Sequence, residues 1–148
     1  MSAQTSLSTL PELIHEAFGK LLISADDSVS QDALTHFWSP HVQETDVSTT
    51  SHFSREKFGE LIGQLRAQYT NRKLVSEAYV ITTPQDKTRR TGSLAATHVF
   101  TACEEAKEVT VTVVAVLRIG WVSESTHGHH DHGGHREVVT EAFIIGVE

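Results

Sequence analysis

The spacing of apolar residues changes from helical to strand-like between residues 69 and 73. Before this point apolar residues recur every three or four positions, whereas after it they alternate. Helices followed by strands are typical of an α+β domain, not of alternating βαβ units. Because 148 residues is the length of one domain, we expect a single domain over residues 1–148 with a loose N-terminus at 1–9.

The first half predicts three amphipathic helices and a short strand. The first helix starts near Pro11, which the first helical turn tolerates. The second is expected to be capped by Ser30 and to end at Pro40, and the third to be capped by Ser54. Residues 41–47 alternate weakly, with Val42, Glu44 and Asp46 on one side, and predict the short strand.

The second half predicts four long antiparallel strands at residues 73–83, 91–103, 109–122 and 137–147. Residues 124–136 are expected to form a histidine-rich hairpin loop before the last strand. A sheet of such strands curls around the helices that cover one face. We therefore expect a cone-shaped α+β roll, with three N-terminal helices packed in a strongly curved antiparallel sheet and an open mouth that suits a ligand.

Charge and composition argue against several classes of function. The formal net charge of −7 is unsuited to nucleic acids and anionic membranes. The longest apolar run, Val113–Leu117, is too short to span a membrane, and residues 1–9 lack the pattern of a signal peptide. The single cysteine, Cys103, fits a reducing compartment. We expect a cytoplasmic protein with no nucleic-acid or membrane partner.

Two stretches link these elements into a familiar order. Residues 37–46 place a helix that ends in an aromatic before a strand that bears an acid, and residues 136–145 form the closing strand after a glycine-containing hairpin. From Leu10 to Gly146 the chain resembles the SnoaL-like and ketosteroid-isomerase-like branch of the nuclear transport factor two-like superfamily. The resemblance implies a cone barrel, a fold that hosts isomerases, dehydratases, cyclases, hydrolases and non-catalytic binding subunits.

The resemblance also implies roles for particular residues. Asp46 matches the acid that shuttles a proton at the end of the first strand in the isomerase branch. That branch also has a tyrosine on the first helix and a second acid in the sheet, whereas this chain has His15 and Phe18 on the helix and no acid within residues 109–122. A dehydratase branch uses histidines on the strands, and His98 fits that role.

Asp46 and His98 are accordingly the predicted catalytic pair. A carboxylate in an apolar cone has a raised pKa and can exchange protons near neutrality, and His98 stands on an otherwise apolar strand face. The simpler alternatives are a strand-end aspartate that caps the following turn, and an interior histidine held by a hydrogen bond.

Further residues could line or border a substrate pocket, although the aromatic ones among them are most simply core. Arg118 could bind an acidic group or pair with Glu141, and Glu44 and Glu77 raise the same ambiguity. The predicted substrate-binding residues are His15, Phe18, Trp38, Phe58, Tyr69, Arg118, Trp121, Glu141 and Phe143.

The histidine tract could bind a transition metal, through His127, His129, His130, His132 and His135. A defined site needs ligands held in fixed geometry, and the glycines among these histidines argue against that. The tract is therefore interpreted as a solvated loop, and no metal or other cofactor is assigned.

These observations predict a small cofactor-independent enzyme that isomerises, cyclises or dehydrates a hydrophobic, oxygenated polyketide- or terpenoid-like substrate by acid–base chemistry. One alternative is a non-catalytic module that binds a ligand or a protein, and a further one is metal binding by the histidine loop. Both strand faces of residues 109–119 are largely apolar or β-branched, so a homodimer through the outer sheet face is expected.

Overall fold

The computed structural model describes residues 7–83, 87–123 and 133–148. The helical elements are α1 (Leu10–Phe18), the π-helical turn η1 (Gly19–Ile23), α2 (Asp27–Phe37) and α3 (Arg55–Gln68). The strands are β1 (Trp38–Asp46), β2 (Ser51–Phe53), β3 (Thr70–Ile81), β4 (Gly92–Glu104), β5 (Lys107–Ser123) and β6 (Gly134–Val147). Within the described residues, no helix is long and apolar enough to cross a membrane.

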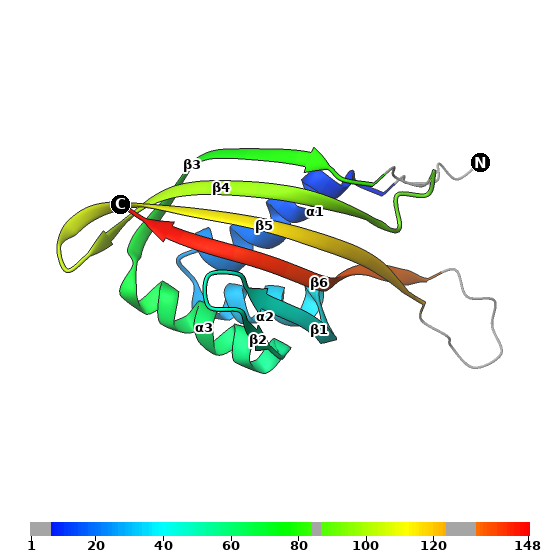
Figure 1. Cartoon of the computed structure of the whole chain (residues 1–148), viewed down its shortest axis with the longest axis horizontal. Coiled ribbons are helices and arrows are strands. Elements are labelled where there is room, and N and C mark those ends of the chain that lie inside the picture. The colour runs from blue at the N-terminus through cyan, green and yellow to red at the C-terminus, as the bar shows by residue number, and fades with distance from the viewer. Residues whose placement is uncertain (1–6, 84–86, 124–132) are drawn as a thin grey trace.

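All six strands form one sheet in the order β2-β1-β6-β5-β4-β3. The long strands β3 to β6 run antiparallel to one another, whereas β1 lies parallel to β6. Figure 1 shows the long strands side by side, with α2 and α3 below β6 and α1 crossing behind β4 and β5. The predicted α+β roll, with three helices packed against a curved sheet, is confirmed.

The core lies between the helices and the concave face of the sheet. Alternate residues of β5, from Val109 to Ile119, are buried there, and α1 packs Ile14 and Phe18 against the same face. Three polar side chains on this concave face are also almost fully buried, namely Glu44, His98 and Glu141. Because buried polar groups need partners, these three residues are the natural starting point for a functional site.

Two expectations about the second helix are wrong. Helix α2 begins at Asp27, and the side chain of Asp26 caps it by accepting from the Ser28 amide at 2.8 Å. Ser30 instead lies inside the helix, where its hydroxyl donates to the Leu21 carbonyl at 2.6 Å. The helix also stops at Phe37, so Trp38 is the first residue of β1 rather than part of the helix.

The wide turn η1 is held by one arginine. The guanidinium of Arg72 donates to the carbonyls of Leu22, Ser24, Arg66 and Tyr69. The carbonyl groups at a helix end have no partner within the helix. Arg72 therefore ties the ends of η1 and α3 to the beginning of β3.

Candidate functional site

His98 lies on the concave face of β4 and is 2% exposed. Its ring stacks flat on Phe18 of α1, with centroids 4.0 Å apart and an interplanar angle of 4°. The Tyr79 ring meets it edge-on at 5.5 Å. Two aromatic neighbours therefore fix the orientation of the imidazole.

A series of polar contacts leads from His98 to the surface. The Tyr79 hydroxyl lies 2.9 Å from His98 Nε2 and 3.3 Å from a carboxylate oxygen of Glu77. On the other side, His15 Nδ1 lies 2.7 Å from the Glu77 carboxylate. We call these four residues the His98 chain. It runs from a buried imidazole to a histidine side chain that is 55% exposed.

The electrostatic environment fixes two protonation states of the His98 chain. Burial lowers the pKa of His98 to about 4, although the Glu77 carboxylate opposes this effect, so the ring is neutral at neutral pH. Burial, followed by the charge of Glu77, raises the pKa of Tyr79 above its usual value. The phenol therefore keeps its proton and can donate it in a hydrogen bond.

The outer end of the His98 chain borders a groove between α1 and β3. Its volume is about 490 Å³, and its walls include Pro11, Glu12, His15, Glu77 and Tyr79. This volume is in the range of small-molecule sites. The groove therefore brings a ligand-sized space to a phenol, a carboxylate and an imidazole.

The structure does not bring Asp46 and His98 together. Strands β1 and β4 are separated in the sheet by β6 and β5, which is roughly 14 Å at the usual strand spacing. The Asp46 carboxylate accepts from the Ser48 amide at 3.0 Å and from the Ser48 hydroxyl at 2.7 Å. Asp46 therefore has the arrangement of a carboxylate that caps the turn after β1.

A second group of predicted residues gathers around β1 and β6. The indole Nε1 of Trp38 donates to Glu141 at 3.0 Å. The Phe58 ring packs against both Trp38 and Phe143. All four residues are buried. This group is separate from the His98 chain, and a second buried acid, Glu44, stands opposite Glu141 in the pairing of β1 with β6.

The other predicted pocket residues lie apart from both groups. Tyr69 caps the end of α3. Arg118 is exposed on the convex face of β5, whereas Glu141 is buried on the concave face of the sheet. The two residues therefore do not pair. Trp121 packs against the Arg90 guanidinium at 4.3 Å.

Four of the five proposed metal ligands, His127, His129, His130 and His132, lie outside the described residues. His135 is described, and its Nε2 lies 3.1 Å from the Glu137 carboxylate. Its ring stacks at 6.2 Å on that of His36. Within the described residues, no three histidine, cysteine or acidic side chains form a group that could hold a metal ion.

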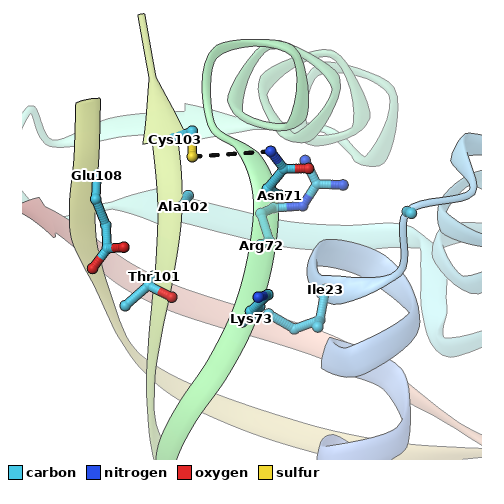
Figure 2. Close-up of a pocket in the computed structure, with 9 residues that line it drawn as sticks. Ile23, Asn71, Arg72, Lys73, Thr101, Ala102, Cys103 and Glu108 are labelled. Carbon is cyan, nitrogen blue, oxygen red and sulfur yellow. Dashed lines mark hydrogen bonds between the residues drawn. The ribbon is translucent and has the colours of Figure 1, made fainter. Parts of the chain in front are cut away.

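A further cavity of about 500 Å³ lies at the other end of β3. Figure 2 shows Cys103 and Glu108 on neighbouring strands, with Lys73 and Asn71 on β3. The Asn71 amide nitrogen lies 3.9 Å from the Cys103 sulfur. Arg72 also borders this cavity, but its guanidinium is engaged by backbone carbonyls.

Tyr79 is not among the site residues that the sequence predicts, and the role of Glu77 stays ambiguous at that level. A register shift between Leu74 and Ser76 lies just before both residues in β3. Beyond it, Glu77 stands opposite His98 and Tyr79 opposite Ala96, on the concave face. Residues two apart in a strand share a face. The positions of Glu77, Tyr79 and Ile81 in the sequence therefore already indicate that these three side chains lie on one side of the strand.

Comparison with known proteins supports the fold and no specific activity. No protein-family model and no curated protein matches the sequence. Among solved structures, an NTF-2-like protein of unknown function from Pseudomonas aeruginosa is similar, with a TM-score of 0.60 and 10% identity over 92% of this chain and 97% of that chain. A multiply substituted protein named Rd1NTF2_05 matches with a TM-score of 0.47 and 13% identity over 90% and 97% of the two chains. The fold is therefore NTF2-like.

Proposed function

We propose that this protein is a cofactor-independent acid–base enzyme of SnoaL-like type, and that its substrate binds in the groove between α1 and β3. One observation carries the proposal. The Tyr79 hydroxyl stands between the buried His98 and the Glu77 carboxylate, and both Tyr79 and Glu77 line the groove. A phenol and a carboxylate beside a ligand-sized space are the components of a proton-transfer site.

The direction of the hydrogen bonds follows from the single proton of the phenol. When Tyr79 donates to Glu77, its oxygen is left to accept a hydrogen bond from the N–H at His98 Nε2. A substrate oxygen in the groove would replace Glu77 as the acceptor. Tyr79 would then stabilise negative charge on that oxygen, while His98 holds the phenol in place.

The released Glu77 carboxylate is the general base in this arrangement. It would remove a proton from the carbon next to the substrate carbonyl, and the resulting enolate would be held by Tyr79. His15, which contacts Glu77 at 2.7 Å, would pass the proton to solvent. Isomerisation, cyclisation and dehydration of an oxygenated substrate can all begin with this step.

Hydrogen–deuterium exchange tests this function without knowledge of the final product. Cyclic ketones that bind the protein, as judged by NMR shifts of groove residues, are incubated in D2O with wild type, Tyr79→Phe or Glu77→Gln. Mass spectrometry measures deuterium gained next to the carbonyl. Glu108→Gln is the matched control, because Glu108 is an exposed strand glutamate outside the groove.

The proposal predicts exchange with wild type and with the control, and at least about 100-fold slower exchange with both site variants. If ketones bind in the groove but exchange no faster with wild type than with Glu77→Gln, the proposed enzymatic function is wrong. That result would favour the alternative, a non-catalytic ligand-binding module.

We also propose that the protein forms a homodimer through the convex face of the sheet. Val80, Ala95, Val116 and Ala142 lie in register across β3, β4, β5 and β6 on that face. Val80 is 63% exposed and Val116 is 51% exposed. A continuous apolar surface of this kind favours association with a second sheet.

A further inference from the structure

Glu44 and Glu141 face each other inside the protein. They are direct partners in the parallel pairing of β1 with β6, and the two strands lie beside each other in Figure 1. The exposed fraction is 0% for Glu44 and 3% for Glu141. Their carboxyl groups are within hydrogen-bonding reach of each other. We call these two residues the carboxyl pair.

Among the residues that the structure describes, one polar donor reaches the carboxyl pair. Trp38 Nε1 donates to Glu141 at 3.0 Å. Within the described part of the chain, no N–H or hydroxyl group reaches either carboxyl oxygen of Glu44. The Phe58 ring packs against Trp38 and against Phe143, and all three rings are buried. Among the described residues, two ionised carboxylates placed here would share one donor, Trp38 Nε1, and would be shielded from water by burial.

The basic groups on the neighbouring elements are engaged elsewhere. On α3, Arg55 donates to the Trp38 carbonyl at 3.2 Å, and Arg66 pairs with Asp27 of α2 at 2.8 Å. On β2, His52 contacts the Thr45 hydroxyl at 3.1 Å. None of these residues supplies a positive charge to the carboxyl pair.

Further charged groups on the packed elements contact other partners or are exposed. On β6, His135 contacts Glu137, and the Arg136 guanidinium donates to the Ser8 carbonyl. On α2, Asp32 and His36 are exposed, as is Arg118 on β5. Among the described residues, therefore, no ion pair neutralises Glu44 or Glu141.

We propose that the carboxyl pair is a buried proton-binding site, which takes up at least one proton when the chain folds. A proton held between the two groups lets one carboxyl donate to the other, and it removes the repulsion between two buried charges. The ligand of this site is the proton itself. The inference does not depend on the proposed reaction, because the pair lies apart from the His98 chain.

The consequence is a stability that falls as the pH rises. Burial, reinforced by the neighbouring carboxyl group, raises the pKa of Glu44 well above its usual range, and burial raises the pKa of Glu141. In the unfolded chain both groups lose their protons near pH 4.3. At neutral pH the folded state therefore holds more protons, and each extra proton lowers the folding equilibrium constant about tenfold per pH unit.

The experiment compares wild type with the double variant Glu44→Gln/Glu141→Gln, in which two amides can bond to each other without a titratable group. The folding equilibrium constant is measured by denaturant unfolding between about pH 7 and about pH 8.5, above the titration of unfolded histidines. Glu108→Gln is the control, since this strand glutamate is exposed.

Wild type and the control are expected to lose about 30-fold or more in the folding equilibrium constant over this range, and the double variant is expected to lose much less. A wild-type constant that stays level across the range would overturn the proposal. So would a double variant that keeps the full wild-type slope.

Infrared spectroscopy gives a second test that needs no denaturation and stands if the double variant fails to fold. A protonated carboxyl group has a carbonyl absorption distinct from that of a carboxylate. Folded wild type at neutral pH is expected to show this absorption. Its absence would contradict proton binding by the pair.

Discussion

The imidazole of His98 lies flat on the ring of Phe18, 4.0 Å away and within 4° of parallel. The residues come from β4 and α1, and their contact fixes His98 Nε2 where Tyr79 meets it at 2.9 Å. This packing keeps the histidine neutral and its hydrogen bond directed. Burial and orientation of one ring therefore link the hydrophobic core to the groove at the surface.

Removing the Tyr79 hydroxyl should destabilise the protein by about 1 kcal/mol, the usual net value of a buried hydrogen bond. Tyr79→Phe leaves His98 Nε2 without this partner but preserves the packing of the ring. Denaturant unfolding at neutral pH measures the change. Val75→Ala, at another exposed valine of β3, is the control and should change the free energy of unfolding less. Equal effects would contradict a stabilising role for the hydroxyl.

Acid should destabilise the protein through His98. In the unfolded chain His98 binds a proton near its ordinary pKa of about 6.5. In the folded chain it binds this proton only at lower pH, because burial lowers its pKa to about 4. Stability is therefore lost as the pH falls through this interval, by as much as about 3 kcal/mol. The free energy of unfolding of wild type should fall relative to that of His98→Gln between about pH 6.5 and about pH 4.5.

The control for this pH dependence is His41→Gln, because His41 is exposed. Its unfolding free energy should follow that of wild type over the whole interval. If His98→Gln also follows wild type, the buried ring does not contribute to the acid dependence.

Arg72 should be more important for stability than its half-exposed position suggests. Its guanidinium donates to four backbone carbonyls at the ends of η1 and α3, and hydrogen bonds from a charged donor are worth more than neutral ones. We expect Arg72→Met to lower the free energy of unfolding by at least about 2 kcal/mol. Lys73→Met, at the exposed next residue, should have little effect, and equal losses would contradict this role.

The proposed homodimer predicts that a charge on the convex face separates the subunits. Val116→Lys should shift the mass measured by light scattering at micromolar concentration from dimer to monomer. Val47→Lys, at a similarly exposed valine beyond β1, should leave the mass unchanged. A monomeric mass for wild type would contradict the proposed homodimer.

Much of the fold follows from local sequence patterns. The change from helical to alternating spacing predicts helices before strands, and the predicted cap of α3, Ser54, is confirmed. The predicted start of α2 is wrong, because Asp26 and Ser30 are both residue types that favour a cap. Only the packing of η1 decides between them, since the Leu21 carbonyl accepts from the Ser30 hydroxyl.

The candidate site was less predictable because it depends on contacts between distant segments. His98, His15 and Phe18 are predicted site residues and lie together. The register of β3 that brings Tyr79 to His98 comes after a register shift between Leu74 and Ser76. The pairing of Glu44 with Glu141 requires β1 and β6 to lie parallel across nearly a hundred residues. Periodicity within a strand assigns each residue to a face of the sheet, but it does not determine which other strand pairs with that strand.

The most direct test of the His98 chain is nitrogen NMR of the His98 ring as a function of pH, in wild type and in Tyr79→Phe. The account predicts a ring that stays neutral from neutral pH down to about pH 5, with an Nε2 signal that changes when the Tyr79 hydroxyl is removed. A ring that titrates near the ordinary value of about 6.5, with an Nε2 signal unaffected by Tyr79→Phe, would contradict it.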